Sequence, residues 1–161
     1  MNQEQIRHIL DTQRAYFSSG ATLPVEKRVQ ALQRLRTAIL DSEAEINAAL
    51  KADLGKSGFE SYMCEVGLTC SEISYMIRHA RRFASERRVP TPLAQFHARS
   101  FVAPEPYGGA LIMSPWNYPV QLCLNPLVGA ISGGNCAVLK PSAYAPATCA
   151  ALAKILGETF P

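Results

Sequence analysis

The chain has 161 residues, of which 48% are hydrophobic and 18% charged, and its formal net charge at pH 7 is +3. This composition suits a single packed domain and excludes an intrinsically disordered chain. The mild positive charge favours no nucleic-acid partner, because the pairs Arg81-Arg82 and Arg87-Arg88 have few aromatic neighbours. We therefore expect both arginine pairs on a solvated helix face.

The amino-terminus and the cysteines both favour a cytoplasmic protein. The opening residues, Met1-Asn2-Gln3-Glu4, predict a polar helix and lack the basic and apolar regions of a secretory signal. The cysteine count is odd, no CxxC pair occurs and no histidine lies near a cysteine in sequence, which argues against a zinc site. We expect reduced, mostly buried thiols and no bound metal. The cysteines are Cys64, Cys70, Cys123, Cys136 and Cys149.

The first half of the chain predicts helices. Apolar residues recur there every three or four positions, which is the spacing of one buried helix face. Pro24 can occupy the first turn of the second helix, and Ser42-x-x-Glu45 has the form of a capping box before the third. We interpret the apolar stripes as core and see no chemistry in them. Helices are expected over residues 3–18, 25–39 and 59–83, with a short one around Ile46 and Leu50.

The character of the chain changes after residue 88. Pro90 and Pro92 favour extended chain, and residues 95–103 alternate loosely between polar and apolar side chains, as a strand does. Residues 104–109 predict a turn. We therefore divide the chain into a helical part at 1–88, an extended hairpin at 89–107 and a βαβα segment at 108–161.

From Pro106 to Leu139 the chain has no acidic or basic residue and no histidine. The run is long enough for a transmembrane helix, but its prolines, glycines and amides break it into short pieces. We favour a buried strand, helix and strand over residues 110–113, 120–131 and 136–139, with Gly133-Gly134 ending the helix. Ala145-Pro146 opens a last helix. Two strands joined by a helix predict a parallel pair, and the fold class is therefore α/β.

Open parallel sheets bind ligands beyond the carboxyl ends of their strands, so residues 114–117 and 140–143 are expected at one edge. The Asn117 amide suits an oxyanion hole, and a turn asparagine that bonds its own backbone is the alternative. Lys140 either donates to a ribose or phosphate or is a solvated lysine at a strand end. Trp116, the single tryptophan, either walls a flat ligand or packs. Neither GxGxxG nor a P-loop is present in the sequence.

Taken together, these segments resemble the amino-terminal third of an aldehyde dehydrogenase. Their order and spacing agree with the family over roughly residues 95–161, and a helical start followed by an extended hairpin agrees too. Tyr118-Pro119 looks most like the fatty-aldehyde branch, whose members often form dimers, so a homodimer is expected for a full-length protein. The matching residues are Pro106-x-Gly108, Pro115-Trp116-Asn117-Tyr118-Pro119, Asn125-Pro126-Leu127, Ala130-x-x-Gly133-Gly134-Asn135, Val138-x-Lys140-Pro141-Ser142 and Ala145-Pro146.

The resemblance implies oxidation of an aldehyde to a carboxylic acid with NAD or NADP. In the family a cysteine thiolate attacks the aldehyde, hydride passes to the nicotinamide, and a glutamate-activated water hydrolyses the thioester. The asparagine that matches Asn117 helps to hold the oxyanion. By position, Lys140 would bond the adenosine ribose, and the other cofactor contacts would be Met113, Ser114, Pro115, Trp116 and Ser142.

Two departures from the family pattern matter. Ala143 stands where the family usually has a glutamate on the ribose hydroxyls, which leaves NAD and NADP both open. The chain also ends before the family's glycine-rich cofactor turn, catalytic glutamate and nucleophilic cysteine, so we expect the catalytic domain to be absent. We expect a fragment that is inactive alone, with a sheet whose open edge invites aggregation. The alternatives are a non-catalytic helical module that binds a partner and a module that binds nucleotide without chemistry.

Overall fold

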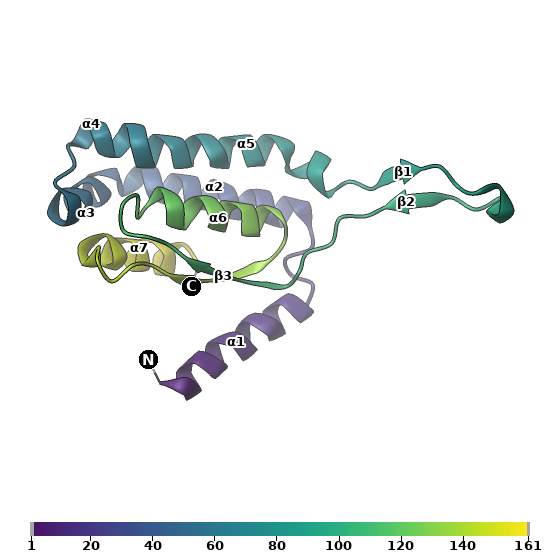
Figure 1. Cartoon of the computed structure of the whole chain (residues 1–161), viewed down its shortest axis with the longest axis horizontal. Coiled ribbons are helices and arrows are strands. Elements are labelled where there is room, and N and C mark those ends of the chain that lie inside the picture. The colour runs from purple at the N-terminus through teal and green to yellow at the C-terminus, as the bar shows by residue number, and fades with distance from the viewer. Residues whose placement is uncertain (1, 161) are drawn as a thin grey trace.

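The computed structural model describes residues 2–160, and it has the α/β architecture that the sequence predicted (Figure 1). Met1 and Pro161, the outer ends of the expected ranges 1–88 and 108–161, lie outside the described residues. In chain order the elements are the helices α1 Gln3–Ser18, α2 Val25–Asp41, α3 Glu43–Leu54 and α4 Gly58–Ser61, the π-helical turn η1 Tyr62–Val66, the helix α5 Gly67–Ala84, the strand β1 Arg87–Val89, the 3-10 turn η2 Leu93–Gln95, the strands β2 Ser100–Val102 and β3 Gly109–Met113, the helix α6 Gln121–Ser132, the strand β4 Cys136–Lys140 and the helix α7 Pro146–Thr159.

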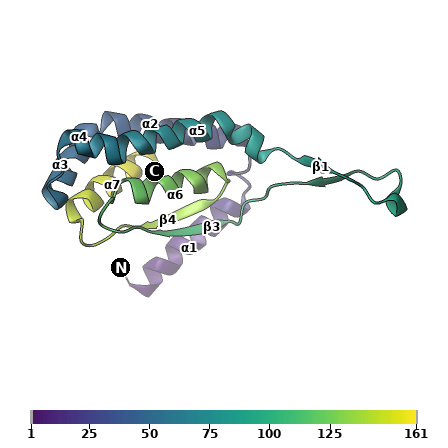
Figure 2. The same ribbon diagram turned by 45° about the horizontal axis from the view of Figure 1, so that its top comes forward.

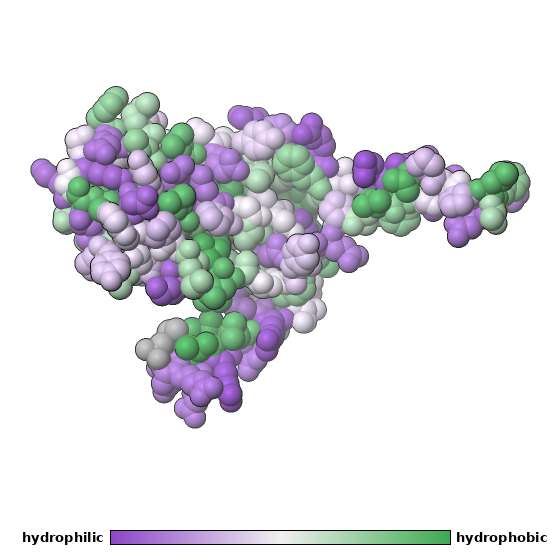
Figure 3. All heavy atoms as spheres, in the orientation of Figure 1, coloured by the Kyte–Doolittle hydropathy of each residue, from purple (hydrophilic) through white to green (hydrophobic). Residues whose placement is uncertain are grey.

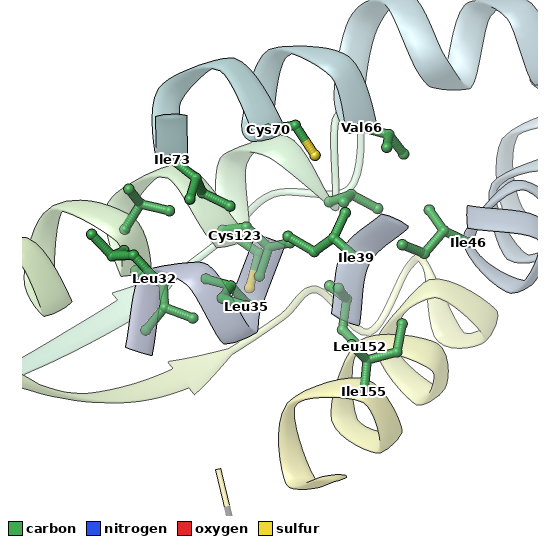
Figure 4. Packing of buried hydrophobic residues seen from close by; sticks show 14 of the residues in the cluster. Leu32, Leu35, Ile39, Ile46, Val66, Cys70, Ile73, Cys123, Leu152 and Ile155 are labelled. Carbon is green, nitrogen blue, oxygen red and sulfur yellow. The ribbon is translucent and has the colours of Figure 1, made fainter. Parts of the chain in front are cut away.

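The apolar stripes of most of the helices form one core, as their spacing predicted. The core interpretation is wrong for residues 3–18, where Ile6 and Leu10 are exposed, and for Phe59, Met63 and Phe83. Side chains from α2, α3, α5, α6 and α7 meet in a single cluster (Figure 4). Burying such side chains is the main favourable term in folding and contributes about 1.5–3 kcal/mol for each Leu or Ile. The cluster therefore fixes the helices that stand behind the sheet. Its fully buried members include Leu32, Leu35, Ile39, Leu50, Ile73 and Val128.

The sheet of β3 and β4 lies between two helical layers. The strands pair in parallel, as expected for two strands joined by the helix α6. α6 covers one face and packs against α2 and α5 behind it, whereas α1 lies along the other face (Figures 1 and 2). α1 buries no residue fully, although its apolar side chains gather on the side toward the sheet (Figure 3).

The extended segment is a hairpin, but the predicted strand over residues 95–103 is wrong for most of its length. Only Ser100–Val102 forms a strand, which pairs antiparallel with Arg87–Val89. The 3-10 turn η2 and His97, at a left-handed φ of 77°, reverse the chain instead. Because these side chains are exposed, no buried face enforces the alternation that predicted a strand. Arg87-Arg88 therefore lies in a strand and not on the expected helix face.

The predicted capping box at Ser42 is also wrong. The Ser42 side chain makes no capping hydrogen bond. The Glu45 carboxylate instead accepts a hydrogen bond from the Lys154 ammonium of α7 at 2.8 Å. The capping box that does form is at the start of α1. There the Asn2 side chain accepts from the Gln5 N–H and the Gln5 side chain accepts from the Asn2 N–H, both at 2.9 Å.

The uncharged run between Pro106 and Leu139 raised the question of a transmembrane helix, which helix length and hydropathy address. Across residues 2–160, no helix combines the length and the apolar character that a bilayer crossing requires. The run instead forms β3, α6 and most of β4, which is the strand–helix–strand order that we favoured. The expected burial of the first strand is wrong, because Leu111 and Met113 are exposed and only Ile112 of β3 is buried.

Candidate functional site

The two segments that the sequence predicted to meet do so at the carboxyl edge of the sheet. β3 and β4 run in parallel register, with Met113 opposite Lys140. Pairing continues one residue further, because the Ser114 N–H donates to the Lys140 carbonyl oxygen at 3.2 Å. The loops that follow the two strands therefore start side by side, although they are far apart in sequence (Figure 2).

Several predicted site residues present open side chains at this edge. Met113 is 72% exposed and Trp116 is 52% exposed, so two large apolar side chains face solvent beside the end of the sheet. Lys140 is exposed, and no carboxylate within residues 2–160 forms an ion pair with it. Apolar walls beside a free cation fit a flat ligand that carries hydroxyl or phosphate groups, such as a dinucleotide. Of the other predicted residues, Pro115 and Asn117 are exposed, and Ser114 and Ser142 are buried.

The Asn117 amide is free. Its side chain is exposed and makes no hydrogen bond to another residue in the range 2–160, while its backbone carbonyl is bonded by a lysine. A turn asparagine that bonds its own backbone is therefore not observed in this loop. A free amide is what a donor to a developing oxyanion needs, and that role for Asn117 stays a prediction.

A buried ion pair that we did not predict lies beneath the Asn117 loop. Lys56 and Glu65 are 7% and 0% exposed, and the Lys56 Nζ donates to Glu65 Oε1 at 2.5 Å and to the Asn117 carbonyl oxygen at 3.1 Å. A signal was present in the sequence, because Glu65 lies eight residues before the core residue Ile73, on the same helix face. An acidic residue on an apolar helix face predicts a buried partner.

Glu65 also caps the helix that follows the loop. Its Oε2 accepts the Val120 N–H at 2.7 Å and the Gln121 N–H at 3.3 Å. α6 has no side-chain cap of its own. The first N–H groups of a helix lack partners inside it, and the helix dipole there favours a negative charge. The carboxylate of Glu65 therefore satisfies the amino-terminus of α6 from another element.

The loop after β4 is held in the same manner by Asp53. Asp53 Oδ2 accepts the backbone N–H and the hydroxyl of Thr148, and its Oδ1 accepts the Ala147 N–H. Burial raises the pKa of Asp53, but these hydrogen bonds to the charged form outweigh it, so the pKa lies below its usual value. Nearer the strand, Ser142 Oγ accepts the Tyr144 N–H at 3.2 Å, which leaves its own O–H free to donate.

The glycine pair Gly133-Gly134 and Asn135 lie at the opposite edge of the sheet and serve the fold. Gly134 has φ +82°, and a side chain there would meet the Arg28 guanidinium at 2.7 Å. Asn135 Oδ1 accepts the Gly108 N–H at 2.9 Å and so ties the starts of β3 and β4 together. These residues therefore have a structural role and do not belong to the site.

Three of the cysteines are poor candidates for a nucleophile. Burial raises the pKa of the Cys70, Cys123 and Cys136 thiols, which disfavours the reactive thiolate. Cys64 and Cys149 are partly buried. Among the described residues, no group of three or more His, Cys, Asp or Glu side chains is placed to hold a metal ion.

The sequence as a whole is similar to aldehyde dehydrogenases. The family model described as "Aldehyde dehydrogenase family" matches residues 1–161. 4,4′-Diaponeurosporen-aldehyde dehydrogenase of Staphylococcus aureus is 37% identical over 147 residues, which are 91% of this chain and 32% of that protein. Aldehyde dehydrogenase family 3 member B1 of Homo sapiens is 41% identical over 148 residues, which are 92% of this chain and 31% of that protein. The chain thus spans about a third of the length of these relatives.

Solved structures of such enzymes share the fold. The substrate-bound state of Staphylococcus aureus AldH superposes with a TM-score of 0.94 at 36% identity, over 99% of this chain and 34% of that chain. Glyceraldehyde-3-phosphate dehydrogenase GapN from Methanocaldococcus jannaschii, complexed with NADP, gives 0.85 at 25% identity, over 99% and 34%. The helical layer and the small, incomplete sheet therefore match the amino-terminal region of this family.

Proposed function

The chain belongs to the aldehyde dehydrogenase family, and we propose that it forms the amino-terminal part of an enzyme that oxidises an aldehyde to a carboxylic acid. The observation that carries the proposal is the free Asn117 amide at the carboxyl edge of the sheet, beside exposed Trp116 and unpaired Lys140. NAD or NADP, when bound, would accept hydride from the substrate. This chain's residues would hold the oxyanion and bind the cofactor.

Each residue at the edge has a role that its chemistry supports. The Asn117 amide donates to the substrate oxygen as that oxygen gains negative charge. The Lys140 ammonium donates to ribose hydroxyls, since it has no carboxylate partner within residues 2–160. Met113 and Trp116 supply the apolar walls. The remaining proposed cofactor contacts are Ser114, Pro115 and Ser142.

We also propose that the 161-residue chain alone has no turnover. The resemblance assigns the attack to a cysteine motif and the hydrolysis to a glutamate motif, and our proposal is that the 161 residues carry neither of them. The raised pKa of the Cys70, Cys123 and Cys136 thiols supports this assignment. Aldehyde-dependent NAD(P)H production by the purified chain would contradict it.

The test of the oxidation is substitution of Asn117 in the polypeptide that carries this chain in its source cell. Asn117→Ala should lower kcat by about 10²- to 10³-fold, as loss of one oxyanion-hole donor does, with a smaller effect on KM for the aldehyde. Gln30→Ala, at an exposed position of α2, is the matched control and should leave kcat unchanged. Full activity in Asn117→Ala, or no aldehyde-dependent NAD(P)H production by the unmutated polypeptide, would contradict the proposal.

The substrate, the oligomer and the compartment follow as finer proposals. The resemblance to the fatty-aldehyde branch makes a long-chain aldehyde the first substrate to assay.

The β1–β2 hairpin projects from the body (Figure 1), and its exposed Leu93, Phe96 and Phe101 support its use in a homodimer. Free cysteines support a reducing compartment such as the cytoplasm. Sedimentation of the polypeptide with Phe96→Ser and Phe101→Ser tests the hairpin, because an unchanged dimer mass contradicts it.

A further inference from the structure

Lys56 and Glu65 touch the Asn117 loop at both of its ends. The Lys56 Nζ lies 3.1 Å from the Asn117 carbonyl oxygen and 4.2 Å from the centroid of the Tyr118 ring. Glu65 holds the Val120 N–H at the other end of the loop, at 2.7 Å. We call Lys56 and Glu65 the buried pair. Between them they bond the backbone on both sides of Tyr118 and Pro119.

The loop has few other side-chain bonds to the body. Among residues 2–160, the Asn117 and Trp116 side chains make no hydrogen bond, and both are exposed. The direction of the Asn117 amide then depends on the position of the Asn117 backbone. Lys56 holds that backbone through its hydrogen bond to the Asn117 carbonyl oxygen. An oxyanion donor must be held in place before the charge develops, so its backbone must be fixed by something rigid.

Glu65 lies in a widened, π-helical turn that directs its side chain into the interior. The π-helical turn η1 places the consecutive residues Glu65 and Val66 both at 0% exposure. A side chain at Gly67 would lie 2.9 Å from the Tyr62 carbonyl oxygen, so a glycine follows this widened turn. π-Turns inside helices are rare and occur often at functional sites. Burial of an ion pair is weak support for stability by itself, because removing two charges from water offsets their attraction.

We propose that Lys56 and Glu65 are positioning residues, which fix the Asn117 backbone so that its amide meets the oxyanion. The proposal rests on the role of Asn117 given under the proposed function. It adds that the orientation of this amide comes from the amino-terminal helices and not from the sheet. The pair touches neither substrate nor cofactor and acts only through the loop.

The first experiment uses the single tryptophan, Trp116, one residue before Asn117. In the 161-residue chain, the double variant Lys56→Met/Glu65→Gln removes the donor to the Asn117 carbonyl, while a glutamine oxygen can still accept from Val120. We expect lower fluorescence anisotropy of Trp116 with an unchanged helical circular dichroism spectrum. Lys154→Met/Glu45→Gln removes another lysine–glutamate pair, of 2.8 Å, and is the matched control. Equal anisotropy in the Lys56→Met/Glu65→Gln variant and the unmutated chain would overturn the proposal.

A second measurement needs no variant and so does not depend on a variant's folding. In the unmutated chain, the Val120 N–H donates to a buried carboxylate. We expect its hydrogen exchange to be as slow as that of Leu124 inside α6. Exchange as fast as that of the exposed residue Tyr107 would show that the loop is not held, and would overturn the proposal.

The activity test separates positioning from general support of the fold. In the aldehyde-oxidising polypeptide, Lys56→Met/Glu65→Gln should lower kcat by about 10²-fold, as a misplacement of about 1 Å does. In an Asn117→Ala background, the same double variant should cause no further loss, because the pair acts through Asn117. An equal loss in both backgrounds means a structural role only and overturns the proposal. An unmutated polypeptide without aldehyde oxidation refutes the proposed function, while anisotropy and exchange still decide whether the pair holds the loop.

Discussion

Asp53 and Glu65 cap the two helices that follow the site loops, and neither lies on the helix that it caps. Glu65 bonds the first N–H groups of α6, and Asp53 bonds those of α7. Each loop at the carboxyl edge of the sheet is therefore anchored at its far end by a carboxylate from the helical layer. The helical half of the chain thus determines where the site loops lie.

Removing the Asp53 carboxylate should destabilise the chain. Asp53→Ala leaves the Ala147 and Thr148 N–H groups without their acceptor, and loss of such a cap costs about 0.5–2 kcal/mol. The free energy of unfolding in urea at pH 7 measures this effect. Asp11→Ala, which breaks an exposed ion pair of 3.5 Å, is the control and should change stability by less than about 0.5 kcal/mol.

The contribution of Asp53 to the free energy of unfolding should also depend on pH and decrease in acid. The pKa of Asp53 is lowered on folding, so its stabilising effect is present above the unfolded pKa of about 3.9. The effect is lost as the pH falls through the lower folded value. The difference in unfolding free energy between the unmutated chain and Asp53→Ala should therefore be constant near neutral pH and shrink in acid. A difference that grows in acid would contradict this assignment.

Gly67 and Gly129 should respond oppositely to alanine. A Cβ at Gly67 lies 2.9 Å from a backbone oxygen that cannot move away cheaply, so Gly67→Ala should cost about 1–3 kcal/mol. Gly129, inside α6, has no atom within 4 Å of such a Cβ, and Gly129→Ala should be neutral or stabilise by up to about 1 kcal/mol. Thermal unfolding of both variants checks the pair. Similar melting temperatures for the two would show that the π-helical turn tolerates a side chain.

Lys140 should contribute to cofactor affinity in the enzyme that carries this chain. Lys140→Met removes a charged donor to ribose, a bond worth about 1.5–3 kcal/mol, so the Kd for NAD or NADP should rise about tenfold or more. Fluorescence titration measures the Kd. Lys51→Met, at an exposed position of α3, should leave it unchanged. An unaltered Kd in Lys140→Met would mean that Lys140 is a solvated lysine at the end of the strand and does not contact the cofactor.

Ala143→Glu should shift cofactor preference toward NAD. Ala143 is exposed three residues after Lys140, in the loop at the carboxyl edge. A carboxylate there would accept from ribose hydroxyls and repel the 2′-phosphate of NADP. The ratio of kcat/KM for NAD and NADP measures the preference, and Ala143→Gln separates length from charge. The same ratio before and after Ala143→Glu would refute the prediction.

The sheet edge was predictable because it depends on local patterns. Short apolar strands on either side of a helix predict a parallel pair, and parallel strands end at the same edge, which is why Met113 and Lys140 are neighbours. The hairpin was predictable from Pro90 and Pro92, but its strand bounds were not. With side chains exposed there, no burial pattern marked which residues pair.

The sequence by itself determined the helices, the two parallel strands and the loops that meet beyond them, because periodicity and turn residues act over short distances. Only the tertiary structure decided what holds those loops. Lys56 reaches Asn117, Glu65 reaches Val120, and Asp53 reaches Thr148, each across a long stretch of chain. In the sequence, the only sign of such a contact is at most a single acidic residue on an apolar helix face. The partner gives no sign, because it is a backbone group that every residue carries.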